Sequence, residues 1–196
     1  MPRSTPASDT NHKYVMLYFK EGDIPYYDII IQKSLDFVKK NDAAYFRKIL
    51  SVSFYILNLD DYISDVPEIR LAFAEYNMRC TAVGTYVMYS PAQTRIHADG
   101  ILNFARINLP LLNCKNTFTH FYSGCHSVHT VDPDSGIIGR YVTNPKEAKL
   151  EASIEMKKAT VVRISEPHIV ELPLGNPIPR ITLSLSFDKD PIFLLD

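Results

Sequence analysis

The part of the chain that follows Cys80 is a succession of short segments rich in β-branched and aromatic residues, and this pattern most limits the possible folds. Pro, Gly, Asn and Asp separate the segments, which read CTAVGTYVMYS, ARINLPLLN, FTHFYSG, GIIGRYVT, KATVVRIS, PHIVELPL and PRITLSLSF. Such segments are typical of strands, and the turn residues between them favour short connections. The sequence therefore predicts an antiparallel sandwich or barrel.

The N-terminal part predicts little sheet. Residues 1–11 are rich in Pro, Ser, Thr and Asp and predict a flexible tail, and residues 12–196 predict a single domain with its β core at about 80–188. Within that domain, residues 13–19 have strand composition. We expect a fold that is mainly β with flanking helices (α+β).

Two segments near the N-terminus predict helices that would pack on one sheet. Residues 24–41 have roughly helical apolar spacing, and lysines end the segment, where cations suit a helix C-terminus. The segment SDVPEIRLAFAEYNM predicts a second helix, with Ser64 or Asp65 as its cap and Pro67 in its first turn. Residues 46–59 fit either a strand or a helix, because their apolar residues are too dense for periodicity to decide.

Composition excludes several classes of protein. The chain has 196 residues with 21 basic against 22 acidic ones and a net charge of -1, so no global field attracts nucleic acid. Its three cysteines form no Cys-x-x-Cys pair, which favours a reducing compartment, and we expect a cytoplasmic location. No apolar run approaches the roughly 18 residues that a membrane span needs.

His97 and Asp99 are the first candidate ligands for a metal ion. Residues two apart on an extended chain point the same way, so both side chains could reach one ion. His168, which opens a later strand, is the best candidate for a third ligand, because His12 lies next to the tail and the other histidines crowd one region. Two imidazoles and a carboxylate form the facial triad that holds non-haem Fe(II).

Arg180, Thr182 and Ser184 are candidate ligands for a carboxylate. Arg180 lies twelve residues beyond His168, which is enough for a turn and a return strand, and the two hydroxyl residues share its face of that strand. A guanidinium with a neighbouring hydroxyl suits a bidentate, charge-assisted pair with a carboxylate. These three polar residues alternate with Ile181, Leu183 and Leu185, and the alternation alone does not tell whether the polar face lines the barrel interior or faces solvent. Given the triad, we expect the polar face to line the interior.

The order His-x-Asp, distant His, then Arg-x-Thr resembles the 2-oxoglutarate and Fe(II)-dependent dioxygenase superfamily. The resemblance spans roughly residues 80–188 and implies a double-stranded β-helix (jelly roll, cupin-like). It also implies Fe(II), the cosubstrate 2-oxoglutarate and O2, with hydroxylation of an amino acid, a peptide side chain or another small molecule. By this resemblance His97, Asp99 and His168 would hold iron, and Arg180 would bind the distal carboxylate of the cosubstrate with Thr182 or Ser184.

The segment HADGILNFARINLPL looks most like the aspartyl/asparaginyl β-hydroxylase-like branch of that superfamily. In this branch an Arg and a polar residue two further on help bind the cosubstrate, a role that would fall to Arg106 and Asn108. Two departures weaken the branch assignment: aspartyl hydroxylases lack the carboxylate that Asp99 supplies, and the Asn108 position is often a His.

Other polar features have simpler interpretations. The segment CHSVH (125–129) lacks a second Cys/His pair at finger spacing and predicts loop residues near the entrance. Tyr86 and Tyr89 are an odd number apart, so only one of them can face the pocket on a regular strand. Two alternatives to the oxygenase remain: a non-catalytic jelly roll that binds a ligand or partner, and a cupin-like metalloenzyme of another reaction type.

Overall fold

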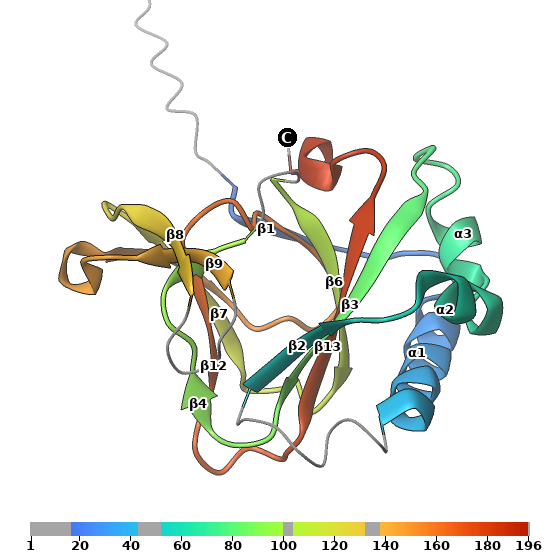
Figure 1. Cartoon of the computed structure of the whole chain (residues 1–196). Helices are drawn as coiled ribbons and strands as arrows, with labels where there is room; N and C mark the ends of the chain where they lie inside the picture. Colours follow the sequence, from blue (N-terminus) through green and yellow to red (C-terminus); the bar gives the residue numbers. More distant parts are fainter. Residues whose placement is uncertain (1–16, 43–51, 100–103, 132–137, 196) are drawn as a thin grey trace, which may run out of the picture.

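A computed structural model describes residues 17–42, 52–99, 104–131 and 138–195, so the predicted tail at 1–11 lies outside the described residues. Two antiparallel sheets face each other (Figure 1). The first sheet runs in the order β1 (Phe19–Gly22), β11 (Ala159–Val162), β6 (Arg106–Leu112), β13 (Arg180–Phe187), β3 (Cys80–Met88) and β2 (Val52–Ile56). The second runs in the order β10 (Lys149–Ile154), β7 (Phe118–Ser123), β12 (His168–Leu172), β5 (His97–Ala98), β9 (Ile138–Val142) and β8 (Ser127–Val131), and β4 (Ala92–Gln93) also pairs with β12.

The helices cover the outer face of the first sheet. They are α1 (Tyr27–Asp42), α2 (Leu59–Asp65) and α3 (Glu68–Ala72), and they lie together beside β3, β6 and β13 (Figure 1). Two short 3-10 helices, η2 (Pro145–Glu147) and η3 (Pro191–Leu194), complete the described elements. The main hydrophobic core lies between the helices and this sheet, because apolar side chains from both fill the same cluster.

The alternation along β13 divides its side chains between two environments. Ile181, Leu183 and Leu185 are buried in the core beneath the helices. Neighbouring side chains on a strand point to opposite faces, so Arg180 and Thr182 point between the two sheets. Both are almost completely buried, and the strand therefore carries its polar residues inside the fold rather than to solvent.

The second sheet places the candidate metal ligands on facing positions. The short strand β5 pairs with β12 so that His97 lies opposite His168, and residues paired in this way share a face. Phe121 of β7 also lies opposite His168 and packs with Ile154, Met156, Val162 and Ile164 in a second apolar cluster. This cluster fills the space between the sheets next to the histidines.

The predicted architecture, an antiparallel jelly roll with helices on one sheet, is confirmed, and several local predictions are wrong. The second helix begins at Glu68 with Pro67 as its N-cap and without a side-chain cap, and Ser64 and Asp65 belong to the end of α2 instead. Residues 127–131 form β8 rather than a loop. The strand β10 was not expected, although its sequence KLEASI alternates polar and apolar residues, and most of its side chains are exposed. Among the described helices, none is long and apolar enough to span a membrane.

Candidate active site

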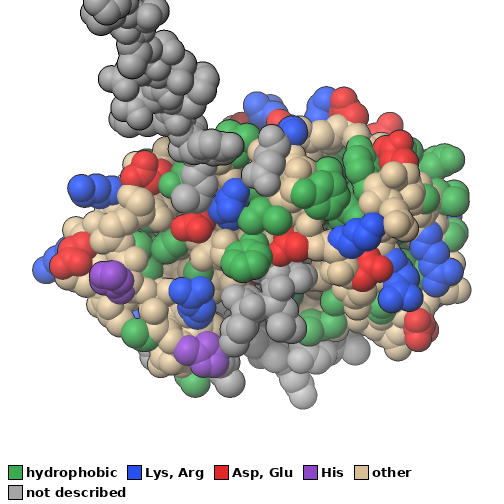
Figure 2. All heavy atoms as spheres, turned by 90° about the horizontal axis from the view of Figure 1, so that it is seen from above, with side chains coloured by type: hydrophobic (Ala, Val, Ile, Leu, Met, Phe, Trp, Pro, Cys, Tyr) green, Lys and Arg blue, Asp and Glu red, His purple; other side chains and the backbone are tan. Residues whose placement is uncertain are grey.

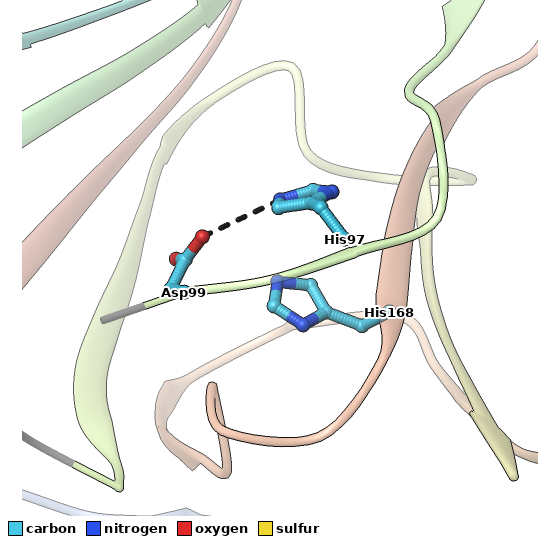
Figure 3. Close-up of side chains that lie close together, drawn as sticks. All are labelled: His97, Asp99 and His168. Carbon is cyan, nitrogen blue, oxygen red and sulfur yellow. Dashed lines mark ion pairs between the residues drawn. The ribbon is translucent and has the colours of Figure 1, made fainter. Parts of the chain in front are cut away.

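His97, Asp99 and His168 converge on one point between the sheets (Figure 3). Each offers one ligand atom, and these atoms all lie within 4.8 Å of one another. His97 Nε2 and Asp99 Oδ1 are 3.5 Å apart, and the two imidazole rings have centroids 4.5 Å apart. One residue of β5 and the residue that follows this strand thus meet one residue of β12, and the register between these strands sets the geometry.

Both histidines are held in the tautomer that a metal ligand needs. Nδ1 of His97 lies 2.8 Å from the carbonyl oxygen of Arg95, and Nδ1 of His168 lies 2.8 Å from that of Glu166. A carbonyl oxygen only accepts, so each Nδ1 carries the hydrogen and each Nε2 keeps a free lone pair. A backbone carbonyl two residues earlier orients the ring in both cases, which leaves the two Nε2 atoms available to an ion.

The electrostatics of the cluster suit a cation. Burial lowers the pKa of His168 to about 4, and the neighbouring His97 adds to this effect, so the His168 ring is neutral at pH 7. Burial works to raise the pKa of Asp99, but the electrostatic interactions with His97, His168 and Arg106 outweigh it and hold that pKa below its ordinary value. The carboxylate is therefore ionised beside the neutral imidazole of His168.

Arg180 lies deep in the fold with a donor that has no partner. Its side chain is 2% exposed, and its Nε donates to the hydroxyl of Thr117 at 3.1 Å. Nη1 is buried without a hydrogen-bond partner among the described residues, and no described carboxylate lies within ion-pair distance. A buried, unpaired guanidinium costs several kcal/mol. Such a group fits a site that an external anion completes.

Polar groups surround Arg180. The guanidinium carbon lies 5.8 Å from the ring centroid of Tyr86, whose hydroxyl is buried without a partner among the described residues. Burial raises the pKa of Tyr86, although the charge of Arg180 opposes this, so the phenol stays protonated and remains a donor. The Thr182 hydroxyl lies 3.7 Å from the Cys114 sulfur, and Ser184 follows on the same face, half-buried.

A second polar group lies across the inner face of the first sheet. The register pairs Asn108 of β6 with Ser184 of β13, and Arg106 precedes Asn108 on the same face. Arg106 Nε and Asn108 Oδ1 are both buried without partners among the described residues. The Arg106 guanidinium carbon lies 6.0 Å from the ring centroid of Phe54. The charge of Arg106 also helps to lower the pKa of Asp99 and that of His168, so Arg106 lies near enough to act on the candidate metal ligands.

A glycine allows this aromatic lining. A Cβ built on Gly84 would lie 2.5 Å from Cζ of Phe54, closer than Cβ contacts in proteins allow. The ring of Phe54, from β2, therefore lies directly over Gly84 of the neighbouring strand β3.

Sequence reasoning missed two threonines. Thr117 orients Arg180, because its hydroxyl donates to the carbonyl of Cys114 and accepts from Arg180 Nε. Thr119 lies two residues further along, on the face of β7 that carries Phe121, with its hydroxyl buried and unpartnered among the described residues. The alternation T-F-T-H-F was a usable signal, since it places both hydroxyls on one face. Of the two tyrosines, Tyr86 contacts Arg180 and Tyr89 packs against the helix-side core, as their odd spacing requires.

Comparisons with known proteins identify a solved structure that has the same fold. No family model matches the sequence, and no curated protein matches it. Among solved structures, HygX from Streptomyces hygroscopicus with nickel and 2-oxoglutarate bound is 9% identical with a TM-score of 0.51, over 88% of this chain and 82% of its own. The epimerase SnoN in complex with Fe3+, alpha ketoglutarate and nogalamycin RO is 14% identical (TM-score 0.49, 86% and 80% covered). A Pseudomonas putida prolyl-4-hydroxylase is 13% identical (TM-score 0.48, 87% and 91% covered). The similarity to HygX shows that the two chains share a fold.

Proposed function

We propose that the protein is an Fe(II)- and 2-oxoglutarate-dependent dioxygenase. One observation carries the proposal: a cluster of two imidazoles with free Nε2 atoms and one carboxylate lies in the same inter-sheet space as a buried arginine that lacks an anion among the described residues. A cluster of ligands needs an ion, and an unpaired buried guanidinium needs an anion. A ferrous ion with an anionic cosubstrate meets both needs.

His97, Asp99 and His168 are the residues that would hold the iron. Two neutral nitrogens and one ionised oxygen from one side of the ion form the donor set that Fe(II) oxygenases use, and they leave positions open for other ligands. The hydrogen bonds from each Nδ1 to a carbonyl keep the rings oriented toward the ion. When bound, iron and 2-oxoglutarate supply the oxidation: O2 is consumed, the cosubstrate becomes succinate and CO2, and a C–H bond of the substrate is hydroxylated.

The chain has a cation for each end of a dicarboxylate. Arg180 would pair with the distal carboxylate, assisted by the hydroxyls of Tyr86, Thr182 and Ser184. Arg106 and Asn108 would help bind the keto-acid end, because the charge of Arg106 acts on Asp99 and because both residues have buried polar atoms without partners among the described residues. The apolar surroundings keep water away and strengthen these interactions.

The proposed substrate is an amino acid, a peptide side chain or another small molecule. The His97-to-Arg106 spacing, which resembles the aspartyl/asparaginyl hydroxylase-like branch, supports this class. A nucleic-acid substrate is disfavoured by the net charge of -1 and by the face drawn in Figure 2, where basic and acidic side chains are interspersed.

The test is optical and anaerobic. Fe(II) plus 2-oxoglutarate should give the weak visible charge-transfer band of chelated iron in the wild-type protein, and His97→Ala should abolish it. His120→Ala is the matched control: His120 lies on the outer face of the same sheet, bonded to Ser153 and Glu171, so this variant should keep the band. A wild-type protein that takes up no metal would favour a non-catalytic jelly roll. Metal uptake without succinate formation from 2-oxoglutarate would favour another cupin-like reaction.

A further inference from the structure

The segment that follows β13 folds back against the entry of β6. Asp190 precedes η3 (Pro191–Leu194), and Pro191 is buried. Leu195 is 1% exposed and packs into the core beneath the helices, with Ile192 and Leu194 against the same cluster. Three apolar anchors thus fix this short turn, and they hold the Asp190 side chain in a constant place.

The Asp190 carboxylate joins two distant parts of the chain. Oδ2 accepts from the backbone N–H of Phe104 at 2.5 Å, and Oδ1 accepts from those of Ala105 at 3.2 Å and Ile192 at 3.0 Å. The bond to Ile192 is an ordinary cap of η3. The two bonds to residues 104 and 105 cap no helix, and they connect the C-terminal turn to the segment that leads into β6.

The two bonded residues flank the candidate metal site. Phe104 accepts at its carbonyl from the N–H of Ser165 at 3.2 Å, and Asp99 donates its own N–H to the carbonyl of Ile164 at 2.8 Å. The chain before and after residues 100–103 is therefore bonded to one dipeptide, 164–165. That dipeptide lies three residues before His168 in the sequence, and β6 begins with Arg106, the residue that follows the two bonded to Asp190.

We infer that Asp190 is a positioning residue for Asp99 and Arg106. This inference rests on the proposed function: the Asp190 carboxylate, which is not itself an iron ligand, holds in place the ligand Asp99 and the neighbouring cation Arg106. The residue must be a carboxylate, because three N–H groups point at its two oxygens, and an amide would turn its NH2 toward at least one of them. No described Lys or Arg lies within ion-pair distance of Asp190, and its hydrogen-bond partners among the described residues are backbone N–H groups.

The experiment compares Asp190→Asn with Asp188→Asn. Asp188 is a matched control, because its carboxylate also accepts from a backbone N–H, that of Arg79 at 2.8 Å, and pairs with the Arg79 side chain at 3.7 Å, so its printed bonds do not involve the residues of the candidate site. Two measurements are made on full-length protein: the Kd for Mn(II), and the hydrogen-exchange rate of the Asp99 amide in metal-free protein. Asp190→Asn should weaken Mn(II) binding about tenfold, the effect of losing a group that orients a metal ligand. It should also speed exchange at Asp99, and Asp188→Asn should change neither by more than about twofold.

The outcomes separate this inference from the proposed function. Equal Asp99 exchange rates in the two variants would overturn the positioning role, whether or not the wild type binds metal. Faster exchange in Asp190→Asn alone, with no Mn(II) uptake by the wild type, would support Asp190 as the holder of this segment and reject the iron site. Mn(II) binding that Asp190→Asn leaves unchanged, despite faster exchange, would overturn the link to the metal centre.

Discussion

Replacing Arg180 by Met should separate stability from function. The guanidinium is buried, its Nη1 has no partner among the described residues, and no described carboxylate compensates its charge. A methionine fills similar space without a charge. We expect Arg180→Met to leave the metal-free protein as stable as the wild type or more stable, and to remove most of its affinity for 2-oxoglutarate.

The magnitudes follow from the contacts. The substitution loses the hydrogen bond to Thr117 at 3.1 Å, which contributes about 1.5–3 kcal/mol to stability. It also loses the contact with the Tyr86 ring, which contributes about 0.5–2 kcal/mol. It also removes the desolvation penalty of an unpaired charge, which is several kcal/mol and offsets that loss. For the cosubstrate, losing a charge-assisted bond of about 1.5–3 kcal/mol raises Kd about ten- to a hundredfold.

Two assays decide the matter. Thermal unfolding of metal-free protein gives the stability, and anaerobic calorimetric titration of 2-oxoglutarate into Mn(II)-loaded protein gives the Kd. Arg180→Lys is the matched variant: it keeps the charge and loses the planar fork, so its affinity should fall between those of the wild type and Arg180→Met. An unchanged affinity of Arg180→Met for 2-oxoglutarate would refute the proposed pairing of Arg180 with the distal carboxylate. A Tm lowered by more than about 10 °C would show that Arg180 is needed for the fold itself.

Three further predictions concern single groups. Tyr86→Phe removes a buried hydroxyl that has no partner among the described residues, so titration should show weaker 2-oxoglutarate binding with an unchanged Tm. Gly84→Ala places a Cβ 2.5 Å from Phe54 and should destabilise the protein by about 1–3 kcal/mol in urea denaturation, with recovery on adding Phe54→Leu. Ser34→Ala leaves the buried Tyr62 hydroxyl without its 2.7 Å partner and should lower the free energy of unfolding by about 1–3 kcal/mol. The double variant with Tyr62→Phe should recover part of this loss, and equal losses in the single and double variants would contradict the prediction.

The sequence predicted the sheets better than the local elements, and it predicted that His97, Asp99 and His168 come together. His97, Asp99 and His168 could be found because their chemistry is rare in strands and their spacing fixes a common face. The alternation on β13 left two faces open, and only the packing of Ile181 and Leu183 against the helices decides between them. Tertiary contacts of that kind are invisible to local periodicity.

Other features could not be read from the sequence for physical reasons. The strand β10 alternates polar and apolar residues over only six positions, and its Leu150 is exposed, so the pattern is a weak strand signal. The bonds from Asp190 to Phe104 and Ala105 join residues about 85 positions apart, and nothing in either segment marks the partner. Thr117 had a signal in its alternation with Thr119, but its role depends on where Arg180 lies.

A crystal soaked with Mn(II) and an inert analogue of 2-oxoglutarate would test the central claim most directly. The account predicts an anomalous peak bound by Nε2 of His97, Nε2 of His168 and a carboxylate oxygen of Asp99, with the distal carboxylate of the analogue against Nη1 of Arg180. Manganese bound elsewhere, or an analogue that leaves Arg180 without an anion, would contradict it.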